Sequence, residues 1–237
     1  MSNIFQLKQF IIVQEKSAMK VGTDSLLLGS FAEINGASTI LDIGTGTGIL
    51  ALMMAQKSSA KIDAVEIEEG AFEEAALNFK ASKWSVNMKV FHTSIQQFES
   101  KTLYDLIISN PPFYAVENNI KIKNSTRAKA RQDKDLPFDV LVEEVMKRLS
   151  ERGKFWLILP TDEAEDFLAI ALKSKLYLHD EILIKPKPSK PINRIVMCFG
   201  KTKTKTISSI FTLYDDAGTS SEEYYELTKD FLLWKRR

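Results

Sequence analysis

The chain has 237 residues, a length typical of one domain or of one domain with an extension. Its 32 Lys and Arg residues nearly balance its 31 Asp and Glu residues, so the formal net charge of +1 excludes a protein that is basic over its whole surface. One cysteine, Cys198, and two histidines exclude a disulfide framework and leave little material for a metal site. No apolar run approaches the roughly 18 residues of a membrane-spanning helix. We expect a soluble, cytoplasmic, monomeric protein without a metal.

From Thr39 onward, short strand-like runs alternate with longer amphipathic ones. The predicted strands are 39–43, 61–66, 86–92, 104–109 and 155–159, and the predicted helices are 49–56, 70–82, 138–149 and 163–173. This alternation indicates βαβ units and a mostly parallel sheet in an α/β fold. Three further strands, 177–184, 194–199 and 206–213, have no helix between them and are expected to form antiparallel hairpins at one sheet edge. A helix over 222–233 closes the chain.

A glycine-rich loop, Gly44-Thr45-Gly46-Thr47-Gly48, lies between the first of these strands and the first helix. Glycine lets the backbone turn sharply and approach a ligand closely. Glu66, at the end of the second strand, is placed to accept hydrogen bonds from two ribose hydroxyls. A dinucleotide site would have glycine where this chain has Ile49, and Asp42 would repel a pyrophosphate. The loop therefore favours S-adenosylmethionine, with its cationic sulfonium, over NAD; the alternative is a structural turn with Glu66 as a surface charge.

The sequence Asn110-Pro111-Pro112-Phe113 follows the fourth strand, at the sheet edge where open α/β folds bind ligands. A nucleobase amine or an amide nitrogen is a poor nucleophile because its lone pair is delocalised. The Asn110 side-chain oxygen and the Pro111 carbonyl can accept hydrogen bonds from its N–H groups and so direct the lone pair toward a methyl donor. The prolines hold the backbone rigid, and Phe113 offers a flat face for the ring that carries the amine. The alternative is a proline turn with Phe113 in the core.

Together these motifs resemble the class I S-adenosylmethionine-dependent methyltransferases that act on amino nitrogens. Further segments narrow the resemblance to the bacterial family that methylates N6 of adenosine 37 in a valine tRNA. These segments are Phe5-Gln6-Leu7-Lys8-Gln9-Phe10, Ala18-Met19-Lys20-Val21-Gly22-Thr23-Asp24, Leu27-Leu28-Gly29, Glu223-Tyr224-Tyr225 and Asp230-Phe231. The resemblance implies one domain over residues 1–237 with a Rossmann-like, seven-stranded, mostly parallel sheet. Residues 1–36 would form a cap over the cofactor site, 37–200 the catalytic core, and 201–237 an extension with a β-hairpin and a helix.

The resemblance also implies a set of site residues. The cap would bring Lys20 and Thr23 to the cofactor, and Thr23 or Asp24 is expected to cap the first helix. Where the family usually has an aspartate for the cofactor's adenine, this chain has Ser94, which accepts a hydrogen bond but brings no charge. The expected cofactor-binding residues are Lys20, Thr23, Asp42, Gly44, Thr45, Gly46, Glu66, Ile67, Ser94, Ile95 and Asn110. The expected catalytic residues are Asn110, Pro111, Pro112 and Phe113, the last of which replaces a tyrosine of many relatives.

Two segments concentrate positive charge and contain no acidic residue. Phosphate contacts from such segments give a salt-dependent affinity for nucleic acid, so we expect a tRNA partner. In the first segment, 121–131, the expected RNA-binding residues are Lys121, Lys123, Arg127, Lys129 and Arg131. In the second, 185–205, they are Lys187, Lys190 and Arg194. The alternative is that both segments are solvated loops, with an edge strand protected by lysine.

The predicted activity is transfer of a methyl group from S-adenosylmethionine to N6 of an adenosine in tRNA, adenosine 37 of a valine tRNA. Two enzymatic alternatives share the Asn-Pro-Pro-aromatic pattern: methylation of guanine N2 in ribosomal RNA and methylation of a protein glutamine. A third alternative is a module that binds the cofactor and associates with RNA without turnover.

Overall fold

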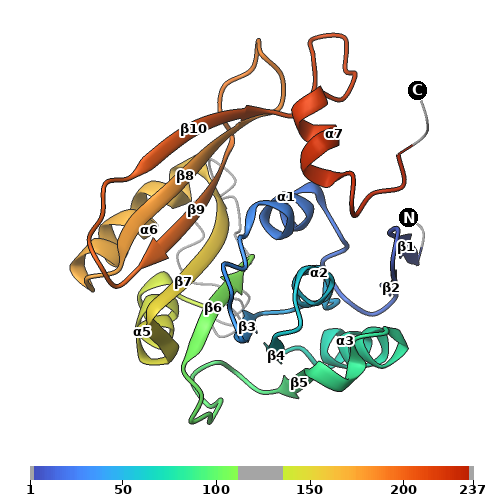
Figure 1. The fold of residues 1–237 in the computed structure, drawn as a ribbon, viewed down its shortest axis with the longest axis vertical. Coiled ribbons are helices and arrows are strands. Elements are labelled where there is room, and N and C mark those ends of the chain that lie inside the picture. The colour runs from blue at the N-terminus through green and yellow to red at the C-terminus, as the bar shows by residue number, and fades with distance from the viewer. Residues whose placement is uncertain (1–2, 112–135, 235–237) are drawn as a thin grey trace, which may run out of the picture.

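The computed structural model describes residues 3–111 and 136–234, which contain a two-stranded and an eight-stranded sheet (Figure 1). The small sheet pairs β1 (Ile4–Gln6) with β2 (Ile11–Val13). The strands of the large sheet are β3 (Thr39–Ile43), β4 (Lys61–Glu66), β5 (Met88–His92), β6 (Tyr104–Ser109), β7 (Leu149–Pro160), β8 (Tyr177–Lys185), β9 (Arg194–Gly200) and β10 (Ile207–Thr212). Their spatial order is β10-β8-β9-β7-β6-β3-β4-β5.

The five strands from β7 to β5 in this order are parallel, as the alternation of strands and helices predicts. The chain runs outward from β3 through β4 to β5 and then returns to the other side of β3 as β6. This change of direction makes a topological switch point between β3 and β6, where open α/β sheets bind their ligands. The glycine loop follows β3 and Asn110 follows β6, so the fold brings the two motifs to the same crevice.

The C-terminal strands differ in part from the predicted hairpins. β9 is antiparallel to both β7 and β8, as expected, but β10 lies parallel to β8, with Ile210 opposite Leu183. β9 has a partner on each side and therefore no free edge, so the chain passes over β8 and pairs with its outer edge. The described sheet thus has eight strands, one more than expected, because β10 extends it rather than forming a separate hairpin.

Helices cover the two faces of the sheet (Figure 1). One face carries α1 (Thr23–Phe31), α2 (Ile49–Lys57), α3 (Glu69–Ala81) and, beside α1, α7 (Glu222–Thr228), and the other carries α5 (Phe138–Arg148) and α6 (Thr161–Lys173). A single 3-10 turn, Ser85–Asn87, leads into β5. Side chains of β7 alternate between the two cores: Trp156 packs with α1 and α2, and Phe155 packs with α5 and α6. β7 is therefore covered on both faces, as its continuous apolar sequence predicts.

Two helix ends differ from the prediction. α1 begins after Gly22, whose backbone is the N-cap, so neither Thr23 nor Asp24 caps it. α7 ends at Thr228 rather than at 233. The carbonyl of Thr228 accepts from the amides of both Phe231 and Leu232, and this turn directs Phe231 into the core. Within residues 3–111 and 136–234, no helix is long and apolar enough to cross a membrane.

Candidate active site

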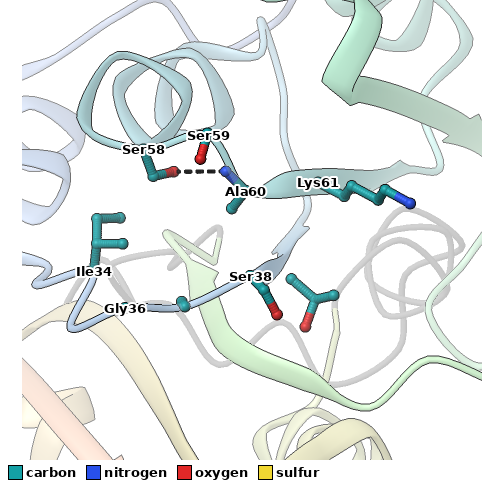
Figure 2. A pocket seen from close by; sticks show the side chains of 9 residues that line it. Ile34, Gly36, Ser38, Ser58, Ser59, Ala60 and Lys61 are labelled. Atoms are coloured by element: carbon teal, nitrogen blue, oxygen red, sulfur yellow. Dashed lines mark hydrogen bonds between the residues drawn. The ribbon is translucent and has the colours of Figure 1, made fainter.

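A cavity of about 880 Å³ lies at the carboxyl ends of β3, β4 and β6. Its walls come from the glycine loop, the ends of β4 and β6, the residues after β5, and the N-terminal segment 17–25. A second hollow, of about 580 Å³, lies at the opposite end of β3 and β4 (Figure 2). There the Ser58 hydroxyl accepts from the amide of Ala60 at 3.4 Å, and Ser38 donates to Asp105 at 2.8 Å. None of the predicted site residues within 3–111 and 136–234 lines this second hollow.

The glycine loop has the tight left-handed turns that its sequence predicts. Gly44, Gly46 and Gly48 have φ angles of 69°, 56° and 86°, a region that residues with a Cβ rarely adopt. At Gly48 a Cβ would also lie 2.6 Å from the ring of Phe79. Gly44, Thr45 and Gly46 all line the cavity. The loop therefore presents its backbone to whatever ligand the cavity holds.

Asp42 does not line the cavity but lies beneath the loop, with no exposed surface. Its Oδ2 accepts hydrogen bonds from the Thr45 hydroxyl at 2.6 Å and from the amide of Ala51 at 3.2 Å. Burial, together with the nearby Glu66 carboxylate, raises the pKa of Asp42 to about 7, although its two hydrogen bonds act in the opposite direction. Asp42 thus ties the loop to the start of α2.

Glu66 lines the cavity at the end of β4, as predicted, and its carboxylate shapes the loop from the other side. Oε2 accepts from the amide of Gly46 at 2.8 Å, and Oε1 accepts from the amides of Ile67 and Glu68, each at 2.9 Å. A carboxylate has about four acceptor positions, so it keeps capacity for a hydroxyl of the ligand. Ile67 next to it is 57% exposed, an apolar surface open to the cavity.

The segment after β5 brings Ser94 and Ile95 to the cavity. Ile95 is buried, whereas Ser94 is only partly buried. The Ser94 hydroxyl accepts from the amide of Gln97 at 3.3 Å and so begins a turn. In the described part of the lining the acidic residues are Asp24, Glu66, Glu68 and Glu69, and none of them follows β5 as Ser94 does.

Asn110 and Pro111 line the cavity at the end of β6. The Asn110 side-chain Nδ2 donates to the Ser25 hydroxyl at 3.1 Å. Its Oδ1 is buried and has no hydrogen-bond partner among the described residues. A buried acceptor without a partner costs free energy, which indicates that it meets a donor when the site is filled. The other predicted catalytic residues, Pro112 and Phe113, lie outside the described residues.

The N-terminal segment reaches the cavity as predicted, and Lys20 and Thr23 are among its lining residues. The Lys20 ammonium donates to the carbonyl of Gln14, and the Gln14 side chain accepts from the amide of Val21 at 2.8 Å, which closes a loop over 14–21. Thr23 is the first residue of α1.

Two residues of α3 that the sequence analysis did not identify hold this segment in place. The buried Glu74 carboxylate accepts from the backbone amides of Lys16 and Ser17. One turn further along, the Asn78 side chain pairs with both backbone groups of Val13 and donates to the carbonyl of Thr47 in the glycine loop. A polar pair at i and i+4 on the buried side of a predicted helix is the signal that could have identified them.

Three of the predicted RNA-binding residues lie at the active-site end of the sheet. Lys187 and Lys190 lie on the connection from β8 to β9, and Arg194 is the first residue of β9. This is the same end of the sheet as Asn110, since Arg194 is opposite Pro160 at the end of β7. The Arg194 guanidinium forms an ion pair with Asp24 of the cavity wall at 2.9 Å. The sequence predicts a contact of Arg194 with RNA but not this contact within the protein. The predicted residues Lys121, Lys123, Arg127, Lys129 and Arg131 lie outside the described residues.

These features fit S-adenosylmethionine better than a dinucleotide. Among the residues that the structure describes, four carboxylates and one lysine, Lys20, line the cavity, and this charge suits a cationic ligand and opposes a pyrophosphate. Glu66 offers acceptors for hydroxyls, and Ile67 offers an apolar surface for a ring. No group of three or more His, Cys, Asp or Glu residues in the described parts of the chain could hold a metal ion.

The fold and this crevice define a Rossmann-like methyltransferase. The sequence model of the methyltransferase small domain matches residues 16–168. Among solved structures, a predicted O-methyltransferase from Agrobacterium tumefaciens has a TM-score of 0.66 at 15% identity and covers 91% of this chain and 100% of that one. A putative RNA methyltransferase from Pyrococcus horikoshii has a TM-score of 0.53 at 19% identity and covers 75% of this chain and 82% of that one. At these identities the likeness supports the fold alone.

Curated relatives give the narrower family. A tRNA1(Val) (adenine(37)-N6)-methyltransferase from Flavobacterium psychrophilum is 41% identical over 97% of this chain and 99% of its own length. A protein of the same name from Phocaeicola vulgatus is 39% identical over 97% of each chain. The chain therefore belongs to the family of tRNA1(Val) (adenine(37)-N6)-methyltransferases, as its N-terminal and C-terminal motifs predict.

Proposed function

We propose that this protein transfers the methyl group of S-adenosylmethionine to the N6 amine of adenosine 37 in a valine tRNA. The observation that carries the chemistry is the buried, unpartnered Oδ1 of Asn110 in the wall of the cavity. Membership of the family, with relatives of this name at 41% and 39% identity over nearly full length, supports the substrate.

Several groups on this chain would bind and orient the cofactor, which supplies an electrophilic methyl group on a sulfonium. Glu66 accepts a hydrogen bond from a ribose hydroxyl with the acceptor position that the three backbone amides leave free. Ile67 and Ile95 contact the adenine ring, and the Ser94 hydroxyl reaches its polar edge. Gly44, Thr45 and Gly46 approach the amino-acid part, and Lys20 and Thr23 close the cavity from the N-terminal side.

Asn110 and Pro111 would orient the amine. The Oδ1 atom of Asn110 and the carbonyl of Pro111 each accept one N–H of the adenosine amine, so its lone pair points at the methyl carbon. The new N–C bond forms as the S–C bond breaks, and the nitrogen then releases one proton to water. Because that proton is acidic after transfer, no residue has to remove it beforehand. Pro112 holds the backbone, and Phe113 stacks on the base.

The basic residues at the active-site end would hold the tRNA. Lys187 and Lys190 lie on the β8–β9 connection at this end of the sheet. From their charge, Lys121, Lys123, Arg127, Lys129 and Arg131 would add further contacts to the tRNA phosphates. Arg194 would contribute through its ion pair with Asp24, which fixes this connection to α1. We further propose that residues 1–237 act as one unit, with 1–36 as cap and 201–237 as extension, and that the protein works as a cytoplasmic monomer.

Replacement of Asn110 by alanine tests this assignment. In the proposed complex Oδ1 contacts the substrate amine, whereas Glu66 and the glycine loop hold most of the cofactor. Asn110→Ala is therefore expected to lower kcat by about 100-fold or more, while the Kd for S-adenosylmethionine stays within about threefold. Calorimetry gives the Kd, and methyl incorporation into tRNA gives the rate. Unchanged turnover would contradict the assignment, and an absence of turnover in the wild-type protein would favour a module that only binds the cofactor.

A further inference from the structure

The orientation of the Asn110 amide depends on Ser25, in the first turn of α1. Ser25 is 9% exposed, and its Oγ accepts the hydrogen bond from Nδ2 of Asn110 at 3.1 Å. An amide nitrogen can only donate and an amide oxygen can only accept. In the structure the Ser25 hydroxyl engages the nitrogen of the amide, so the end without a partner among the described residues is Oδ1.

The opposite orientation would be incompatible with the proposed reaction. The terminal torsion of asparagine has two broad positions that exchange the oxygen and the nitrogen. With the nitrogen toward the cavity, the Asn110 amide would present N–H groups to the N–H groups of the substrate amine. The Asn110 side chain could then not accept from the amine, and only the Pro111 carbonyl would remain to hold it. A contact that keeps the nitrogen at Ser25 therefore keeps the amide in the productive state.

The first turn of α1 is itself held rigidly. The amide of Leu26 donates to the carbonyl of Gly22 at 3.3 Å. The neighbouring Asp24 forms its ion pair with Arg194 on β9 at 2.9 Å. Ser25 thus lies on a turn that is tied to the central sheet, and it can fix the amide of Asn110 with little loss of its own freedom.

We infer that Ser25 is a positioning residue: its hydroxyl fixes the Asn110 amide with Oδ1 directed at the methyl acceptor. This inference rests on the proposed function, since it assigns Asn110 the role of acceptor for the substrate amine. It extends the active site into α1, an element that precedes the glycine loop, and it gives the cap a part in orienting the substrate as well as in closing the cofactor cavity.

A double-mutant cycle tests the inference in the full chain. The variants are Ser25→Ala, Asn110→Ala and the double variant, with Ser30→Ala as matched control. Ser30 is also a serine of α1, and its buried hydroxyl has no partner among the described residues, so its loss should leave kcat unchanged. Ser25→Ala is expected to lower kcat by about 3- to 10-fold, the effect of one hydrogen bond, with the Kd for S-adenosylmethionine within about twofold. In the Asn110→Ala background the same change should have no effect.

A second measurement does not depend on turnover. In ¹⁵N-labelled protein the side-chain NH₂ signal of Asn110 is identified by its loss in Asn110→Ala. Its exchange with solvent should be faster in Ser25→Ala than in wild type and unchanged in Ser30→Ala. Equal exchange rates in wild type and Ser25→Ala, or a loss of kcat that is the same with and without Asn110, would overturn the inference. A wild-type protein that transfers no methyl group to tRNA would instead overturn the proposed function, and the exchange measurement would still decide the role of Ser25.

Discussion

Asp42 is a carboxyl group that the fold places under the glycine loop, away from both solvent and the cavity. Burial is the main cause that raises its pKa from 3.8 to about 7. The folded protein therefore holds a proton at pH values where the unfolded chain has released it. Below about pH 4 Asp42 is protonated in both the folded and the unfolded chain, and its full contribution to the free energy of unfolding is present. This contribution is lost as the pH rises to about 7.

The substitution Asp42→Asn removes this titration while it keeps an acceptor for Thr45 and Ala51. Relative to the variant, the free energy of unfolding of the wild type should fall between about pH 4 and pH 7, with a slope of at most about 1.4 kcal/mol per pH unit. Urea unfolding of both proteins at pH 4.5, 6 and 7.5 measures the difference. A difference that does not vary with pH would show that Asp42 is ionised throughout this range.

At the scale of elements, α3 connects the cap to the cofactor cavity. Glu74 holds the amides of Lys16 and Ser17, and Asn78 joins β2 to the glycine loop. The residues that follow, 17–25, form one wall of the cavity. Affinity for the cofactor should therefore depend on two side chains of α3 that do not themselves line the cavity.

Glu74→Gln tests this connection. Glutamine keeps one acceptor oxygen but turns an NH₂ group toward a backbone N–H, so the segment 16–17 should detach from α3. We expect the Kd for S-adenosylmethionine to rise by about 10-fold, from the penalty of an unpaired buried N–H, with kcat at saturating cofactor close to wild type. The control is Glu73→Gln, which removes only the exposed ion pair with Lys16. If both variants bind the cofactor equally well, Glu74 does not position the cap.

The elements also show what the sequence can and cannot predict. The parallel strands, the glycine loop and the positions of Glu66 and Asn110 follow from local patterns, because each motif lies directly after a strand whose apolar run is clear. The parallel pairing of β10 depends on β9 having no free edge, which only the assembled sheet determines. The roles of Glu74 and Ser25 depend on contacts with residues 57 and 85 positions away in the chain, and no local pattern contains them.

At the scale of the whole molecule, the net charge is near zero, but lysines are gathered at both ends of the sheet. Lys187 and Lys190 lie at the active-site end of the sheet. Lys203 and Lys205, before β10, lie at the other end, since β10 begins opposite the early part of β8 and the nearby Lys201 donates to the carbonyl of Leu149 at the start of β7. The sequence presents these lysines as one basic segment, whereas the fold divides it.

This division gives a matched pair of variants. The double substitution Lys187→Gln and Lys190→Gln should raise the KM for tRNA and reduce the slope of log affinity against log salt by about 1 for each phosphate that the variant no longer binds. Lys203→Gln with Lys205→Gln removes the same charge from the far end and should leave both quantities near wild type. Titrations at several salt concentrations measure the slopes. Equal effects of the two pairs would mean that the tRNA is attracted by total charge and not by the active-site end.

The central claim is that the protein methylates N6 of adenosine 37 in a valine tRNA. The most direct measurement incubates purified protein with methyl-labelled S-adenosylmethionine and total tRNA from a strain that lacks the activity, then identifies the labelled nucleoside and its position in the isolated tRNA. We predict label in N6-methyladenosine at position 37 of valine tRNA, incorporated about 100-fold more slowly, or slower still, by Asn110→Ala. Label in N2-methylguanosine, or in ribosomal RNA or protein but not in tRNA, would contradict the claim.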